Sequence, residues 1–129
     1  MDKLEEIFRL QASFQEKIKR ERNLEGIPME KWLQMQTLAM VSELAEVLEE
    51  VNFKWWKNPH ELNDEHIREE LCDLLHFLVG MCLEAGMSAD DLFNVYLGKN
   101  RENFQRQDGQ SDKKGYEVHP PLADGMQQA

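Results

Sequence analysis

Two pairs of acidic residues stand three positions apart at two separate places in the chain. Glu43 and Glu46 form the first pair, and Glu70 and Asp73 form the second. Residues three apart in an α-helix leave it on one side, with Cβ atoms about 5–6 Å apart. If two such helices pack antiparallel, four carboxylates share one pocket. Because Mg²⁺ takes hard oxygen ligands, usually carboxylates together with water and phosphate, the spacing predicts a magnesium site for a phosphorylated ligand.

Each acidic pair also has a simpler interpretation. The glutamates between residues 43 and 50 lie opposite an apolar stripe, and such a row is usually a solvated helix face. Asp73 argues against that interpretation for the second pair, because it is flanked by Cys72 and Leu74 and a lone buried carboxylate is costly. His76 follows three residues later, either as a hydrogen-bonded core histidine or as a polar contact to a substrate.

A third group concentrates basic and amide side chains within residues 96–107 of an otherwise acidic protein. It comprises Lys99, Asn100, Arg101, Asn103 and Arg106. Such groups suit phosphate oxygens and sugar hydroxyls. The alternative is that cations near the C-terminal end of a helix complement the negative end of its dipole.

Four helices are expected to position these groups. Apolar residues repeat at helical spacing in four segments, which we expect to span residues 2–22, 28–52, 64–86 and 89–104. A loop rich in aromatic residues, 53–62, separates the second helix from the third. The sequence therefore predicts an all-α fold, a four-to-five-helix antiparallel bundle, with a helical catalytic domain over residues 1–107. Residues 108–129 lack periodicity and are predicted to form a flexible C-terminal tail that orders on substrate.

Composition limits the classes of function. With 25 acidic and 15 basic residues, the net charge of −10 argues against duplex nucleic acid or a membrane as partner, since both need a positive surface. Cys72 and Cys82 lack paired spacing and are expected in the core of a cytoplasmic protein. The most apolar stretch, residues 71–83, is too short to span a bilayer. Because it is apolar nearly all round, we expect part of it to be buried in a homodimer.

Longer motifs surround the candidate residues. They are Ser-Glu-Leu-Ala-Glu at 42–46, Glu-Glu-Leu-Cys-Asp-Leu-Leu-His-Phe at 69–77, and Lys-Asn-Arg-Glu-Asn-Phe-Gln-Arg-Gln at 99–107. These motifs resemble the all-α nucleoside triphosphate pyrophosphatase superfamily and, within it, the dimeric dUTPase family. The narrower likeness adds Leu-Gln at 10–11, Phe-Lys-Trp-Trp-Lys at 53–57 and Gly-Tyr at 115–116, and extends over residues 7–116.

The resemblance implies hydrolysis of dUTP to dUMP and pyrophosphate, which clears dUTP and supplies the precursor of dTMP. It implies two or more Mg²⁺ held by Glu43, Glu46, Glu70 and Asp73, with water attacking the β-phosphorus and Glu43 orienting or deprotonating it. It also implies a homodimer with shared active sites and a uracil pocket between helices. The implied base pocket is Gln11, Gln15, Trp55 and His76, with Trp56 as the alternative stacking partner. The implied sugar and phosphate contacts are Lys57, Lys99, Asn103 and Arg106, with Lys113 or Lys114 in a tail that closes as a lid.

Two departures from the family pattern leave the substrate open. Gln15 stands where the pattern Leu-Gln-x-x-Leu-Asn has Asn, and the stretch before Gly-Tyr at 115–116 is longer than usual. A MazG-like relative that hydrolyses dCTP or other non-standard or damaged nucleotides would share the metal carboxylates and differ in the base pocket. A rival of another class is a non-catalytic helical dimer that binds a protein partner through its Trp-Trp loop, with the glutamates solvated.

Overall fold

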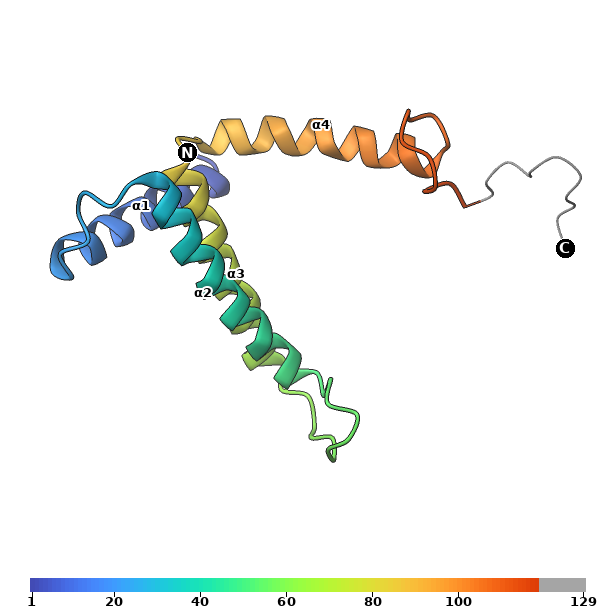
Figure 1. Cartoon of the computed structure of the whole chain (residues 1–129), viewed down its shortest axis with the longest axis horizontal. Coiled ribbons are helices and arrows are strands. Elements are labelled where there is room, and N and C mark those ends of the chain that lie inside the picture. The colour runs from blue at the N-terminus through green and yellow to red at the C-terminus, as the bar shows by residue number, and fades with distance from the viewer. Residues whose placement is uncertain (119–129) are drawn as a thin grey trace, which may run out of the picture. The chain divides into compact units, whose positions relative to one another are not determined.

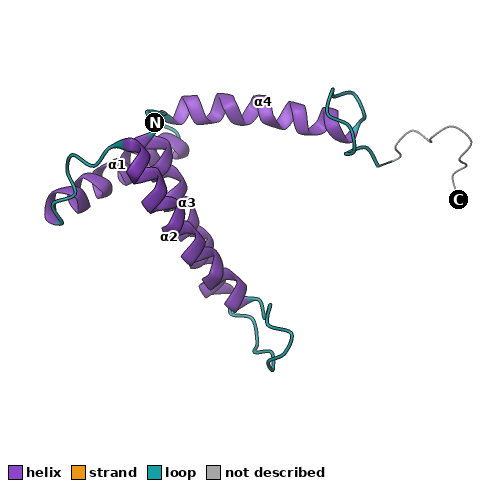
Figure 2. Cartoon of the chain, viewed as in Figure 1, coloured by secondary structure: helices purple, strands orange, loops and turns teal. Residues whose placement is uncertain are grey.

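The computed structural model describes residues 1–118, which form four α-helices and no β-strand (Figures 1 and 2). The helices are α1 (Lys3–Glu21), α2 (Met29–Glu50), α3 (Asp64–Glu84) and α4 (Ala89–Gln107). The predicted all-α class is confirmed, and the helix ends lie within three residues of those expected. The last part of the predicted tail, residues 119–129, lies outside the described residues. No single described helix is both long and apolar enough to cross a membrane, although α3 and α4 together, across their break, would pass by length and composition.

The chain divides into two compact units, residues 1–90 and the residues from 91 onward. In the first unit, α2 and α3 lie side by side as an antiparallel hairpin, and α1 packs against α3 (Figure 1). The second unit contains nearly all of α4 and the residues that follow it. Both acidic pairs therefore belong to the first unit, and the basic segment belongs to the second.

Two helix starts are fixed by side chains that satisfy free backbone N–H groups. Asp2 caps α1 by accepting a hydrogen bond from the Glu5 N–H at 2.8 Å. Asn63 caps α3 by accepting from the His66 N–H at 3.2 Å, as its position before two acidic residues predicts. The cap fixes where α3 begins, and so sets which residues of α3 face α2.

The loop between α2 and α3 is closed by Asn52 and His60. Asn52 has a φ of 59°, a region that Asn tolerates better than most residues, and its side chain exchanges two hydrogen bonds of 2.9 Å with the His60 backbone. The His60 ring nitrogens lie 2.7 Å from the Glu61 carbonyl and 2.9 Å from the Glu49 carbonyl. Both contacts are with acceptors, so the two bonds form together only on a doubly protonated imidazole, and they raise the pKa of His60.

The buried core of the chain is small. Its apolar members are Phe8, Trp32, Val79, Cys82 and Ala89. Within one chain, α1 and α2 cover only part of α3, and Leu71 and Leu78 stay 51% and 42% exposed. Part of the apolar surface of α3 is therefore uncovered in the single chain. Cys82 is buried as expected, whereas Cys72 is exposed and lines a groove between α1 and α3.

Candidate active site

Three of the four candidate carboxylates converge between α2 and α3. Glu43 and Glu46 leave α2 one turn apart, and Glu70 faces them from α3 because the two helices run antiparallel. One carboxylate oxygen from each lies within 4.8 Å of the others. Asp73 is half-buried one turn further along α3, close enough for its charge to act on Glu43 but outside this group of three.

The converging carboxylates disfavour one another's ionisation. Burial raises the pKa of Glu43, and the negative charges of Glu46 and Asp73 raise it further. The pKa of Glu70 rises to about 7, first because its carboxyl group is hydrogen-bonded to that of Glu46, and then because of burial and the charge of Glu46. Without a cation, the cluster therefore holds a proton more readily than separate glutamates would.

Two oxygens of this cluster are left without donors. Glu43 Oε2 and Glu70 Oε2 are buried and have no hydrogen-bond partner among the described residues. A buried carboxylate oxygen is costly unless a donor or a cation satisfies it. Hard oxygen ligands at this spacing fit Mg²⁺, which keeps some of its waters and takes one or two carboxylates. The cluster is therefore a candidate metal centre.

A groove of about 350 Å³ lies between α1 and α3. Its apolar walls are Ile7, Leu10, Phe14, Cys72 and Leu75, and its polar members are Gln11 and His76. His76 Nδ1 lies 2.8 Å from Gln11 Oε1. A concave apolar pocket with a few convergent polar groups is the usual form of a small-molecule site. Two of the four candidate base-pocket residues therefore meet in one groove.

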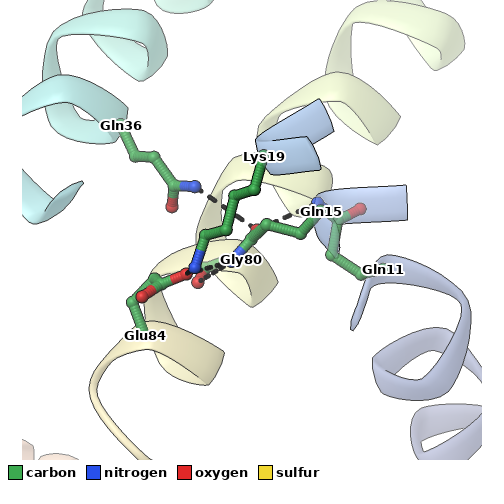
Figure 3. Close-up of polar contacts among 6 residues, drawn as sticks. All are labelled: Gln11, Gln15, Lys19, Gln36, Gly80 and Glu84. Carbon is green, nitrogen blue, oxygen red and sulfur yellow. Dashed lines mark hydrogen bonds and ion pairs between the residues drawn. The ribbon is translucent and has the colours of Figure 1, made fainter. Parts of the chain in front are cut away.

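Gln15, the third candidate base-pocket residue, lies behind Gln11 in a buried polar cluster formed by α1, α2 and α3 (Figure 3). Its side-chain nitrogen donates to Glu84 Oε1 at 2.8 Å and to the Gly80 carbonyl at 3.4 Å. Its side-chain oxygen accepts from Gln36 at 3.3 Å and from Gln11 at 3.5 Å. Since Gln15 is 7% exposed, it supports the groove from behind.

Sequence reasoning missed four members of this buried cluster, which are Lys19, Gln36, Gly80 and Glu84. Two signals could have found part of it. Gln36 follows Trp32 by one helical turn, and both residues are buried on the same side of α2. Gly80 interrupts the apolar stretch of residues 71–83, and an isolated glycine inside a helix often marks a close approach. A Cβ at Gly80 would lie 2.6 Å from Gln15 Oε1.

The loop between α2 and α3, which contains Trp55, Trp56 and Lys57, lies at the end of the hairpin away from α1 (Figure 1). Trp55 is 87% exposed, and its ring meets that of Trp56 edge-on with centroids 5.3 Å apart. The first unit therefore does not bring these three residues to the groove of Gln11 and His76.

The remaining candidates lie in the second unit. Lys99 and Asn103 are exposed on α4. The Arg106 guanidinium pairs with Glu102 at 2.8 Å and lies 5.2 Å from the centre of the Tyr116 ring, so it holds the segment after α4 against the end of that helix. Both tail lysines, 113 and 114, are exposed.

Comparison with known proteins adds a family and two relatives. A family model described as dUTPase matches residues 3–88, a range that contains both acidic pairs and the groove. The dCTP pyrophosphatases of Enterobacteria phage T4 and Enterobacteria phage LZ5 are 45% and 48% identical to the chain over 42 residues. Each match covers 33% of this chain, and the matched stretch spans only 25% and 24% of those relatives. No solved structure matches the chain.

Proposed function

Since the chain belongs to the dUTPase family, we propose that it hydrolyses dUTP to dUMP and pyrophosphate with Mg²⁺. The observation that carries this proposal is the convergence of Glu43, Glu46 and Glu70 from two helices. A solvated acidic face would leave each carboxylate in water, whereas two oxygens here are buried without donors in the described part of the chain. The cluster therefore suits a cation better than it suits a purely structural helix pair.

We assign the four carboxylates to holding Mg²⁺ against the triphosphate, with Asp73 joining the three that converge. When bound, the metal neutralises phosphate charge and makes coordinated water a better nucleophile. Glu43 is the residue we assign to orienting the attacking water and accepting its proton, because burial and neighbouring charges raise its pKa and make it a stronger base than an ordinary glutamate.

The groove between α1 and α3 is the proposed base site. Glu70 and His76 are six residues apart on α3, which separates them by about 9 Å along the helix axis. A nucleoside triphosphate can bridge such a span between its phosphates and its base. Gln11 and His76 would supply polar contacts to the base, and the apolar walls would cover its ring.

We propose that a second copy of the chain completes the site. Large apolar side chains stay exposed on both helices of the hairpin, among them Leu38, Val41, Leu44 and Leu48 on α2 and Leu71 on α3. Contiguous apolar surface of this kind marks an interaction site. The Trp55–Trp56 loop lies away from the groove of its own chain, so a partner copy offers the means to bring a tryptophan and Lys57 to the base and phosphates. The basic and amide residues of α4, which are Lys99, Asn103 and Arg106, would reach the triphosphate in the same assembly.

A second candidate substrate is dCTP, because both curated relatives are named dCTP pyrophosphatases. The two activities share the metal carboxylates and the bond that breaks, and they differ at the edge of the base. Cys72 and Cys82 are both free thiols, which is consistent with an enzyme that acts in the reducing cytoplasm, whichever of the two nucleotides is its substrate.

The test is release of pyrophosphate from dUTP, dCTP, dTTP and the common ribonucleotides, each with Mg²⁺ and with EDTA. Turnover that needs Mg²⁺ and is confined to dUTP would support the proposal. Turnover of dCTP would move the assignment to the second candidate. No turnover of any nucleotide would favour a non-catalytic dimer that binds a partner.

Variants of the carboxylates sharpen this test. Glu70→Gln and Asp73→Asn should each lower turnover by more than about 100-fold. Mutating a residue that only supports a metal ligand already costs about 10–100-fold in metal affinity or activity, and loss of a ligand itself should cost more. Glu69→Gln is the matched control, because Glu69 precedes Glu70 and is exposed. Circular dichroism checks that all three variants keep their helices. Near wild-type turnover in Glu70→Gln and Asp73→Asn would refute the metal site.

A further inference from the structure

In the buried polar cluster, Gln15 links Glu84 to Gln11 (Figure 3), and Gln11 in turn contacts His76. We propose that Glu84, acting through Gln15 and Gln11, fixes the proton of neutral His76 on Nδ1, so that Nε2 presents a hydrogen-bond acceptor to the groove. Glu84, Gln15 and Gln36 are thereby positioning residues. That the groove receives a base rests on the proposed function, whereas the placement of the proton does not.

Glu84 sets which groups donate and which accept along the chain of hydrogen bonds. Its side chain is 14% exposed and forms an ion pair with Lys19. An ionised carboxylate can only accept hydrogen bonds, so the Gln15 group that faces it at 2.8 Å must be the amide nitrogen. The second hydrogen of that nitrogen points to the Gly80 carbonyl, which is also an acceptor, at 3.4 Å. Two separate acceptors, the Glu84 carboxylate and the Gly80 carbonyl, thus fix the same orientation of the Gln15 amide.

The next step runs from Gln15 to Gln11. With its nitrogen committed to Glu84 and Gly80, Gln15 turns its oxygen to the other side, where it can only accept. Gln11 Nε2 lies 3.5 Å from that oxygen and Gln36 Nε2 lies 3.3 Å from it. Two donors from two different helices therefore meet one oxygen. Their arrangement opposes inversion of the Gln15 amide, because an inverted amide would turn its N–H groups toward the two donors.

The last step reaches His76. Because Gln11 turns its nitrogen to Gln15, its oxygen faces His76 Nδ1 at 2.8 Å. An amide oxygen only accepts, so Nδ1 must carry the hydrogen, and in a neutral imidazole the other nitrogen is then an acceptor. Among the described residues, no hydrogen bond engages His76 Nε2. The groove therefore offers a lone pair that fits an N–H group of a ligand and disfavours a carbonyl or an unprotonated ring nitrogen at the same point.

Burial and a glycine on α3 leave room for this arrangement of the amides. Gln11, Gln15 and Gln36 are all at most 9% exposed. A Cβ at Gly80 would lie 2.6 Å from Gln15 Oε1 and 3.0 Å from Gln36 Oε1, so the close approach of the amides requires a glycine on α3. Reversing the Gln15 amide would set donors against donors, and reversing the Gln11 or Gln36 amide would set an oxygen against the Gln15 oxygen. The network therefore favours one arrangement, although Gln36 Oε1 stays buried without a hydrogen-bond partner in the described part of the chain.

The test reads the nitrogen atoms of His76 directly. The full chain, labelled with ¹⁵N-histidine and free of nucleotide, is examined by NMR at a pH well above 7, and His76→Gln identifies the resonances by their loss. The expected result is a protonated Nδ1 and an unprotonated Nε2. A proton on Nε2 in the wild-type protein would overturn the proposal.

Two variants separate direction from stability. Glu84→Gln can donate as well as accept, so the amides can invert and the two nitrogens of His76 should move toward an averaged signal. Lys19→Met breaks the same ion pair but keeps an acceptor-only side chain at 84, so the wild-type signal should persist. Equal changes in both variants, or no change in Glu84→Gln, would contradict the relay.

Kinetics distinguishes this inference from the proposed function. If the chain hydrolyses a nucleotide, Glu84→Gln should raise KM by about 2- to 12-fold, the worth of one hydrogen bond, and change kcat little. If the wild-type protein hydrolyses no nucleotide, the proposed function fails while the nitrogen signals still decide the relay. A wild-type KM in Glu84→Gln together with altered His76 signals would refute a role in recognising the base.

Discussion

Gly80 allows a quantitative test of the buried cluster. Replacing a glycine inside a helix with alanine usually stabilises it by about 0.8–1 kcal/mol, because alanine has the higher helix propensity. At position 80 we expect the opposite sign. The added Cβ would lie 2.6 Å from Gln15 Oε1 and 3.0 Å from Gln36 Oε1, whereas ordinary contacts begin near 3.4 Å.

The size of the effect follows from where the displaced atoms can go. Gln15 Oε1 must retreat by about 0.8 Å, the difference between 3.4 Å and 2.6 Å. It already accepts two bonds of 3.3 Å and 3.5 Å, so a retreat of that size loses at least one of them. A buried polar group left unpaired costs about 1–3 kcal/mol. After the gain in helix propensity, the free energy of unfolding should fall by about 1 kcal/mol, and by at most about 2 kcal/mol.

The assay is urea unfolding followed by far-ultraviolet circular dichroism, which reports all four helices. Gly98→Ala is the matched control, since Gly98 lies inside α4 and a Cβ there would have no atom within 4 Å. That variant should be more stable than wild type by up to about 1 kcal/mol. If Gly80→Ala is as stable as Gly98→Ala, the glutamine cluster does not require the glycine and the reasoning is wrong.

Three further predictions concern pH. Because the pKa of Glu70 is about 7, protons compete with Mg²⁺, so Mg²⁺ affinity measured by calorimetry should weaken as the pH falls below about 7, and a constant affinity would argue against Glu70 as a ligand. In the metal-free protein, the same folded-state pKa lies above the ordinary 4.5, so the folded state binds more protons and stability should decrease as the pH rises from about 4.5 to about 7; a rise over that range in denaturant midpoints would contradict this. The pKa of His60 is raised by its bonds to the Glu61 and Glu49 carbonyls, so the stability that His60 gives to the closed loop should be complete below pH 6.5 and be lost as the pH rises through the folded-state pKa. Amide hydrogen exchange in residues 51–63 measures this. Exchange that is equally slow below and above that pKa, or that His60→Gln leaves unchanged at low pH, would refute the prediction.

The helices and the convergence of three of the four acidic residues could be predicted because they depend on short-range spacing, whereas Asp73 was expected in the same pocket and lies outside the converging group. A period of 3.6 residues places Glu43 beside Glu46, and the antiparallel pairing of α2 with α3 brings Glu70 opposite them. The cap at Asn63 follows from residue type alone. These features need no knowledge of how distant side chains pack.

The role of Gln15 could not be predicted in the same way. On α1 it follows Gln11 by one turn, so both were expected to face the base, yet Gln15 is directed at Glu84, a residue 69 positions later. The direction of a glutamine amide depends on which partner accepts and which donates, and that is set by tertiary packing. Cys72 was expected in the core but is exposed for a related reason, since apolar spacing shows that a face can be buried but not which partner covers it.

The polarity of the groove also bears on the choice between uracil and cytosine. His76 Nε2 offers an acceptor, and Gln11, which spends one amide hydrogen on Gln15, keeps another that can donate. An acceptor beside a donor matches an N–H beside a carbonyl in uracil, and equally an amino group beside a ring nitrogen in cytosine. Both bases therefore carry a donor next to an acceptor that His76 and Gln11 could bind, and the rest of the groove is apolar. The remaining group of that edge is a carbonyl in both bases, but it lies beside the N–H in uracil and beside the ring nitrogen in cytosine. Under the proposed function, selection between dUTP and dCTP would therefore depend on where a further polar contact meets that carbonyl, and the partner copy of the proposed dimer is where that contact should be sought.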